Sequence, residues 1–195
     1  EDILQLIQLQ YRSILSFAGR FEQISFQKNT EMRPKKGAGN VIYKRPGKMR
    51  WKYLEPEEQL LVTNGKTLWL FDPLLENVTV QSLEKIADGT ALSFMLGLGD
   101  LKYDFERRKI TKSLLETRDG FIVELVPKKN TANLEFIQLK VHPETFNLKI
   151  ILLMDKFGNY RTISLKSMEY NLELEDKLFE FEITKNMEVI EVGNR

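Results

Sequence analysis

Residues 39–72, GNVIYKRPGKMRWKYLEPEEQLLVTNGKTLWLFD, decide the fold class because they contain several extended segments joined by turns. Pro46-Gly47 marks the first turn. Asn64-Gly65 marks the next, and it is a strong hairpin signal because type I′ turns need positive φ angles. Asp72-Pro73 turns the chain again. We therefore predict consecutive antiparallel strands across this stretch.

Bulky apolar side chains gather on one face of these predicted strands, together with one arginine. Because side chains alternate between the faces of a strand, Val41, Tyr43 and Arg45 share one face. The matching positions of the next strand are Met49, Trp51 and Tyr53. A buried arginine needs hydrogen-bond acceptors, because an unpaired charge is costly among apolar groups. The pattern favours binding over catalysis, although a surface arginine before a turn remains the simpler interpretation of Arg45 from the residues alone.

The rest of the chain predicts more strands, with helices only at the start and in the middle. Apolar residues at helical spacing predict a helix over residues 3–16, and residues 84–101 favour one or two short helices. Asp119-Gly120 is expected to join residues 114–115 to a strand in a hairpin. The later strands are expected at residues 121–126, 136–141, 148–154, 161–168 and 179–183, with a short one at 189–190. We expect an α+β protein, a single domain over residues 1–195, whose helices cover the inner face of one strongly curved antiparallel sheet.

Motifs along nearly the whole chain occur in a recognisable order. They begin with Phe17, Phe21 and Gln23, continue with Lys44-Arg45-Pro46-Gly47-Lys48-Met49-Arg50-Trp51, Pro56, Asn64-Gly65-Lys66-Thr67-Leu68-Trp69 and Phe71-Asp72-Pro73, and end with residues 90–97, 125–128 and 154–159, Asn171 and Phe179-Glu180-Phe181. In order and spacing, this set resembles the LolA family of periplasmic lipoprotein carriers.

The resemblance implies an unclosed β-barrel of about 11 strands with a lid of about three α-helices. It implies a chaperone that binds the acyl chains of lipoproteins in a cavity under the lid and moves them from the inner to the outer membrane. The matching arginine of the family hydrogen-bonds to lid-helix carbonyls when the lid is closed, which gives Arg45 the role of a latch. The expected cavity-lining residues are Tyr43, Met49, Trp51, Ile14, Phe17, Phe21, Leu92, Phe94 and Leu96. Ordinary core packing would produce the same pattern at these positions.

The composition argues against several other classes of protein. The 29 basic and 28 acidic residues give a net charge of +1, whereas a nucleic-acid partner calls for a one-sided basic field. The absence of cysteine excludes disulfides, thiolate catalysis and cysteine-ligated metals. The single histidine, His142, precedes Pro143 in an expected turn, so a Ser-His-Asp site would have to be built on that residue. We expect no enzymatic activity, no metal and no cofactor.

The resemblance also implies partners and a location. The partners are acylated lipoproteins, an inner-membrane ABC-type release complex and an outer-membrane receptor, and we expect a monomer in the periplasm with its signal peptide already removed. A binder or sensor of other envelope lipids, such as phospholipids or glycolipids, would have the same fold and cavity chemistry, so the sequence leaves this alternative open. The receptor variant of the fold would need an acylated cysteine, which favours a carrier here.

Two segments depart from the family pattern. Thr90-Ala91 stands where Thr-Pro often opens a lid helix, which removes the fixed φ of proline from the first turn. Thr184-Lys185-Asn186-Met187 replaces a segment of the type Pro-x-Gly near the end of the chain. In the family this last region contributes to partner interactions, so the partner surface is left open.

Overall fold

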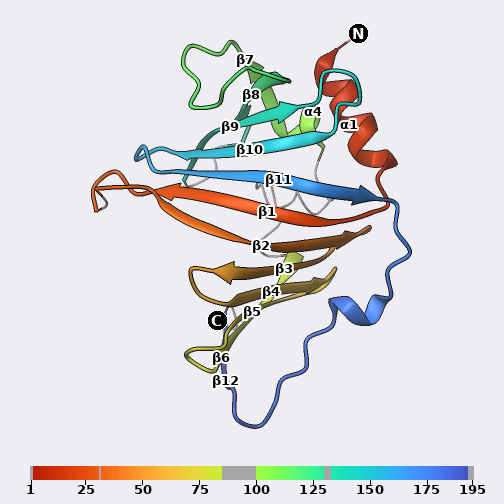
Figure 1. The fold of residues 1–195 in the computed structure, drawn as a ribbon, viewed down its shortest axis with the longest axis vertical. Helices are drawn as coiled ribbons and strands as arrows, with labels where there is room; N and C mark the ends of the chain where they lie inside the picture. Colours follow the sequence, from red (N-terminus) through yellow and green to blue (C-terminus); the bar gives the residue numbers. More distant parts are fainter. Residues whose placement is uncertain (1, 31, 85–99, 130–132, 193–195) are drawn as a thin grey trace.

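The computed structural model describes residues 2–30, 32–84, 100–129 and 133–192. Within them the strands form a single sheet of 12 strands, with α-helices at one end (Figure 1). The strands are β1 (Ser16–Phe26), β2 (Lys35–Lys44), β3 (Lys48–Glu55), β4 (Gln59–Asn64), β5 (Thr67–Asp72), β6 (Asn77–Ser82), β7 (Phe105–Arg108), β8 (Phe121–Pro127), β9 (Leu134–Val141), β10 (Leu148–Asp155), β11 (Tyr160–Tyr170) and β12 (Glu188–Glu191). The helices are α1 (Ile3–Ser13), α4 (Leu101–Asp104) and the 3₁₀-helix η1 (Asp176–Phe179).

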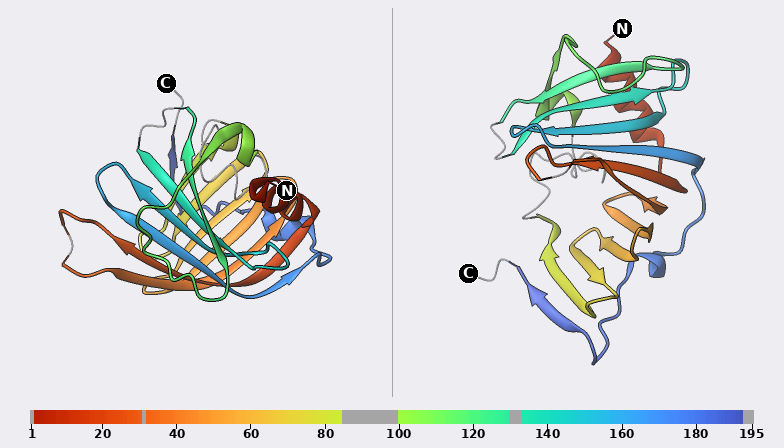
Figure 2. Two further views of the ribbon diagram at one scale, coloured as in Figure 1. Left: turned by 90° about the horizontal axis from the view of Figure 1, so that it is seen from above. Right: turned by 60° about the vertical axis from the view of Figure 1, so that its left-hand side comes forward.

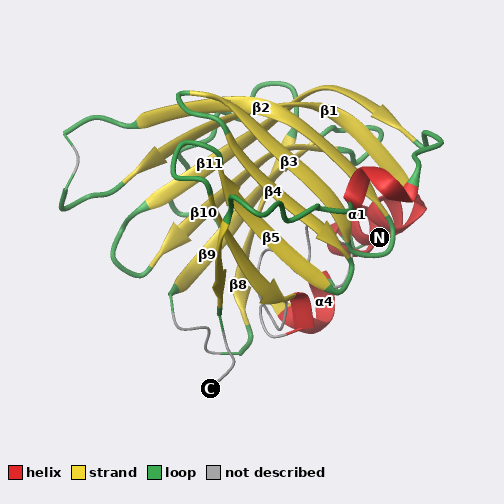
Figure 3. Cartoon of the chain, turned by 90° about the horizontal axis from the view of Figure 1, so that it is seen from below, coloured by secondary structure: helices red, strands yellow, loops and turns green. Residues whose placement is uncertain are grey.

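Two meanders meet in the middle of the sheet. The strand order is β12-β6-β5-β4-β3-β2-β1-β11-β10-β9-β8-β7, so the first and the eleventh strands are neighbours. All neighbouring strands are antiparallel except β12, which pairs with β6 in parallel. The sheet is strongly curved, and its edge strands β12 and β7 do not pair with each other (Figures 2 and 3). The described strands therefore make an unclosed barrel with a concave and a convex face.

A glycine and two irregularities in strand pairing contribute to the curvature of the middle strands. A Cβ atom on Gly39 would lie 1.9 Å from the carbonyl oxygen of Lys52, so only glycine allows β2 and β3 to approach this closely. The register of the same pair shifts between Ala38 and Gly39, and that of β1 and β11 shifts between Ala18 and Arg20. Such bulges bend a strand and increase its twist.

Helix α1 covers one end of the concave face. Asp2 caps it, because its Oδ1 accepts a hydrogen bond from the Leu4 amide at 3.0 Å. Gln8 Oε1 accepts a hydrogen bond from the Leu101 amide at 2.8 Å, which ties α1 to α4. The buried stripe of α1 faces the main apolar core, which includes Leu4, Ile7, Tyr11, Phe17, Phe21, Val41, Tyr43, Met49, Trp51, Leu139, Ile151 and Ile163.

The tail, residues 171–187, crosses the convex face. A second apolar cluster, made of Val62, Trp69 and Val78, lies there beneath Phe181 and Met187 of the tail. The rings of Trp69 and Phe181 are 6.4 Å apart, and Phe179 of η1 is fully buried. The tail then enters β12 at the edge of the sheet.

An ion-pair clamp fixes the start of the tail. Asp176 accepts contacts from Lys44 Nζ at 2.6 Å and Lys48 Nζ at 2.7 Å. These two ammonium groups lower the pKa of Asp176 to about 2. The side chain of Lys44 also donates to the Leu174 carbonyl at 2.7 Å. The tail is therefore attached to β2 and β3 at one end and to β6 at the other.

The observed sheet corrects the expected strand count and direction. The sequence predicted about 11 antiparallel strands, whereas the described residues form 12, one of them in parallel pairing. The strand expected at 179–183 is wrong: Phe179 ends η1, and the chain then follows the convex face to reach β12. Phe179 is buried and the partly buried Phe181 packs against Val62, Trp69 and Val78, which explains the apolar pattern there without any strand pairing.

Two other boundaries also differ. Helix α1 ends at Ser13 rather than at residue 16, because Ile14 is already extended and Ser16 begins β1. The hairpin expected between residues 114–115 and 121–126 is wrong, since β8 pairs with β7 and residues 109–120 connect the two strands. Most of the helical region expected at 84–101 lies outside the described residues.

Candidate functional site

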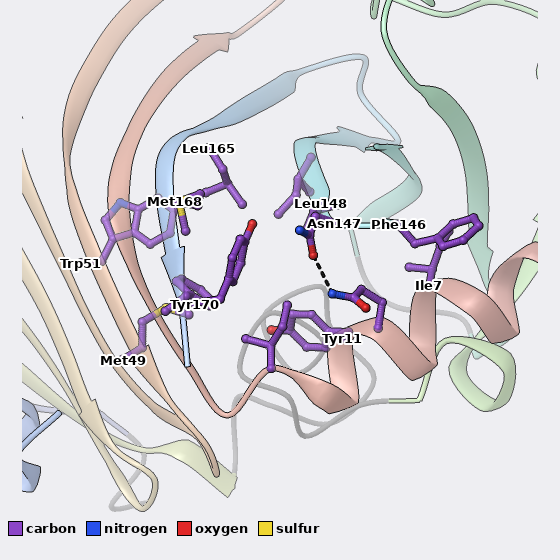
Figure 4. A pocket seen from close by; sticks show the side chains of 14 residues that line it. Ile7, Tyr11, Met49, Trp51, Phe146, Asn147, Leu148, Leu165, Met168 and Tyr170 are labelled. Atoms are coloured by element: carbon purple, nitrogen blue, oxygen red, sulfur yellow. Dashed lines mark hydrogen bonds between the residues drawn. The ribbon is translucent and has the colours of Figure 1, made fainter. Parts of the chain in front are cut away.

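A small apolar cavity lies between α1 and the concave face of the sheet (Figure 4). Its volume is about 30 Å³. In its described wall, Gln10 Nε2 donates to Asn147 Oδ1 at 2.8 Å. The described residues that line the cavity are Ile7, Gln10, Tyr11, Ile14, Phe17, Met49, Trp51, Phe146, Asn147, Leu148, Ile151, Leu165, Met168 and Tyr170. With α1 in this position, the cavity has room for about two water molecules and no acyl chain.

The structure brings together many of the expected lining residues. Ile14, Phe17, Met49 and Trp51 line the cavity directly. Tyr43 and Phe21 are fully buried in the same core, behind the wall. Leu92, Phe94 and Leu96 lie outside the described residues. Whether these side chains contact a bound lipid stays a prediction.

Sequence reasoning missed the wall contributed by β10 and β11. Leu148, Ile151, Leu165, Met168 and Tyr170 all line the cavity. The alternation of apolar residues in 148–154 and 161–168 marked both strands, but it did not indicate which face was concave. The pairing of β1 with β11 supplies that information, because it places the last long strand beside Phe17 and Phe21.

Aromatic rings connect the helix to the sheet. The rings of Tyr11 and Tyr43 are 6.4 Å apart, and those of Phe17 and Tyr43 are 5.0 Å apart. Burial raises the pKa of the Tyr11 phenol well above its usual value, and the neighbouring Tyr43 adds to this rise while Arg45 opposes it. Burial also raises the pKa of Tyr43. Both phenols therefore stay neutral on the inner side of α1.

Arg45 lies at the carboxyl end of α1, directly after β2. Its Nη2 donates to the Tyr11 carbonyl oxygen at 2.9 Å, and its Nε lies 3.4 Å from the Ile14 carbonyl oxygen. Its guanidinium carbon is 5.7 Å from the centre of the Tyr11 ring. The last carbonyls of a helix lack partners within the helix and carry partial negative charge, so they suit a guanidinium. The half-buried arginine thus has acceptors on the helix that covers the cavity.

An open trough continues from the cavity along the concave face. Met49 and Trp51 line both spaces, so they form the wall between them. The trough has a volume of about 590 Å³. Its other described lining residues are Gln23, Ser25, Lys35, Lys36, Gly37, Tyr53, Pro56, Glu57, Gln59, Leu61, Leu70, Leu153, Arg161 and Ile163. The concave face therefore has a covered apolar end beneath α1 and an uncovered end with a more polar rim.

The single histidine caps a turn, and metal-ligand side chains do not cluster in the described parts of the chain. His142 Nδ1 accepts hydrogen bonds from the amides of Glu144 and Thr145, both at 3.3 Å, so the ring caps a turn. Across the residues that the structure describes, no group of three or more His, Cys, Asp or Glu side chains could hold a metal ion.

Comparison with known proteins assigns the chain to a family. The sequence profile of a family described as "Outer membrane lipoprotein carrier protein LolA" matches residues 12–182. This chain belongs to the LolA family. The family is one of carriers, and the resemblance to it found in the sequence is thereby confirmed.

Individual relatives agree with this LolA assignment. An outer-membrane lipoprotein carrier protein of Legionella pneumophila (strain Corby) is 30% identical over 187 residues, which are 95% of this chain and 88% of the relative. A protein of the same name from Azotobacter vinelandii is 32% identical over 177 residues, 90% of this chain and 82% of the relative. An uncharacterized conserved protein of Thermus thermophilus has the same fold, with a TM-score of 0.58 at 12% identity, covering 97% of this chain and 96% of that one. None of the helices in the described residues has the length and apolar character to cross a membrane.

Proposed function

We propose that this LolA-family chain is a periplasmic carrier that takes acylated lipoproteins from the inner membrane to the outer membrane. The observation that supports this most is the concave face, where an apolar cavity beneath α1 continues into an open trough. Binding an acyl chain there needs no covalent chemistry, because each buried CH₂ group contributes about 0.8 kcal/mol. The ligand is then released unchanged.

The cavity beneath α1 must expand to accept a chain. Its 30 Å³ is too small for an acyl group, so we propose that α1 moves away from the sheet when ligand enters. The hydrogen bonds of Arg45 to the α1 carbonyls would stabilise the arrangement without ligand. Closure of the helix over the apolar wall then competes with ligand. This competition keeps the affinity for long acyl chains low enough for release.

The remaining parts of the proposal concern the lid and the partners. A lid of about three α-helices, of which α1 is one, would cover the whole cavity. The acylated cargo would be received from an ABC-type release complex of the inner membrane and passed to a receptor at the outer membrane. The names of the relatives support cargo of this kind.

The test is competition for a fluorescent apolar probe by a triacylated lipopeptide and by its unacylated twin. Displacement by the acylated peptide alone is the expected result. A phospholipid run in parallel separates a lipoprotein carrier from a binder of envelope lipids in general, because equal displacement by the phospholipid would favour the second. Absence of probe binding to the folded protein would contradict both.

A further inference from the structure

The wall between the cavity and the trough contains a buried hydrogen-bond donor without an acceptor. Trp51 is only 5% exposed, and its indole Nε1 lies near the Tyr53 hydroxyl but makes no hydrogen bond of normal geometry within the described residues. A buried N–H group of this kind is disfavoured unless something accepts its hydrogen bond. Since Trp51 lines both spaces, an acceptor could be supplied by a ligand that extends from one into the other.

Other polar groups lie beside Trp51 on the floor of the trough. The Tyr53 hydroxyl donates to Gln23 Oε1 at 2.8 Å, which leaves the amide nitrogen of Gln23 out of this bond. Burial raises the pKa of the Tyr53 phenol, and the positive charge of Arg161 and the neighbouring Trp51 and Gln23 side chains oppose the rise. The side chains of Trp51, Gln23 and Arg161, from β3, β1 and β11, therefore line one trough around the Tyr53 side chain.

The surroundings of these donors restrict the ligand. Leu61, Leu153 and Ile163 line the same trough, so the donors lie within an apolar surface. A ligand that fits must carry acceptor oxygens directly attached to hydrocarbon. The ester carbonyls that join acyl chains to a glyceryl head have this chemistry, and the neutral N–H groups of Trp51 and Gln23 match a neutral acceptor.

We propose that the trough binds the ester carbonyls of the acylated head of a lipoprotein, with the Trp51 indole N–H as a donor to one of them. The acyl chain would extend beneath the raised α1, the ester would lie at the Trp51 wall, and the head would leave through the open trough. This inference rests on the proposed carrier function and deepens it. It makes Trp51 a ligand-binding residue in addition to a member of the core.

The test compares a lipopeptide carrying ester-linked acyl chains with a twin whose chains are joined by ethers, which lack the carbonyl. We expect the ester form to bind the wild type about five- to tenfold more tightly, the size of one net hydrogen bond. Trp51→Phe keeps an apolar ring but removes the N–H, so it should bind both twins equally. Trp69→Phe is the matched control, because Trp69 lies on the convex face, and it should keep the ester preference.

A second measurement follows the donor directly. The chain has two tryptophans, so Trp69→Phe leaves Trp51 as the source of the indole N–H signal in an NMR spectrum. The ester form should move this signal downfield, and the ether twin should not. Equal affinity of wild type for the twins, or an ester preference that survives in Trp51→Phe, would overturn the inference while the carrier function stands.

Two further outcomes distinguish a failure of the ester-binding proposal from a failure of the proposed carrier function. If neither lipopeptide binds the folded wild type, the carrier function fails and the inference fails with it. If phosphatidylglycerol binds as tightly as the ester lipopeptide and loses affinity equally in Trp51→Phe, the trough recognises phospholipid esters instead, and its assignment to lipoproteins is overturned. Weaker binding of phosphatidylglycerol supports that assignment.

Discussion

The two faces of the sheet each carry an apolar cluster and a tryptophan, but their coverings are attached in different ways. On the convex face the tail is held by the Asp176 ion pairs, by fully buried Phe179 and by the pairing of β12 with β6. On the concave face α1 covers a cavity and an open trough, and Arg45 binds its carboxyl end. The difference indicates that the convex covering is part of the permanent fold, whereas the concave covering can be exchanged for ligand.

The largest effect on stability is expected when the packing of the tail against the convex face is disrupted. Phe179→Ala should reduce the free energy of unfolding by about 3–5 kcal/mol, because it removes a fully buried ring against β3 and β4. Urea unfolding measures the loss. The exposed neighbour Leu178 provides the control, and Leu178→Ala should change stability far less. Equal losses in the two variants would contradict a tail that is packed as part of the fold.

The two tryptophans compare the faces directly. Trp51→Ala should lower the affinity for a triacylated lipopeptide, and it should cost about 3 kcal/mol or less of stability because the site borders open space. Trp69→Ala should lower stability without changing lipopeptide affinity in the folded protein, since its ring packs against the tail. Calorimetry of binding and urea unfolding check both variants. Wild-type behaviour of Trp51→Ala in both measurements would place this residue outside the ligand path.

The arginines test the attachment of each covering. Arg45→Leu should reduce the free energy that holds α1 on the concave face by about 1.5–3 kcal/mol, the scale of a hydrogen bond from a charged group. The affinity for an apolar probe should therefore rise about tenfold or more. Arg50→Leu is the matched control, because Arg50 faces the tail, with Nη1 3.4 Å from the Leu178 carbonyl oxygen. It should leave probe affinity unchanged. An unaltered affinity in Arg45→Leu would contradict its role as a latch.

The smallest expected effect is on how the free energy of unfolding depends on pH, through Asp176 in the tail. The pKa of Asp176 is lowered from 3.8 to about 2 in the folded protein, so its contribution is present above pH 4 and is lost as the pH falls towards 2. Because the carboxylate is exposed, the effect should be small. Asp176→Asn should flatten the decline in stability between pH 4 and pH 2, as measured by urea unfolding at each pH. An identical decline in the variant would show that the ion pairs add nothing.

Local features of the sequence predicted which side chains of β3–β5 share a face, but they did not predict which distant strands pair with each other. Asn64-Gly65 fixes a hairpin within a few residues, and alternation then places Trp51 and Met49 on one face. The partner of β8 and the path of the tail depend on contacts between segments far apart in the chain, and no local pattern encodes them. The grouping of polar side chains in the trough was missed for the same reason, since Gln23, Tyr53 and Arg161 come from three different strands.

The central claim, that α1 must leave the concave face for an acyl chain to enter, is tested most directly by tying the helix down. Gln10 and Asn147 are hydrogen-bonded across the cavity, and the chain has no cysteine, so Gln10→Cys combined with Asn147→Cys gives one defined pair of thiols. A short, reducible bis-methanethiosulfonate cross-linker would join them. The cross-linked protein should fail to bind a triacylated lipopeptide and should recover binding after reduction. Equal binding before and after reduction would contradict the claim.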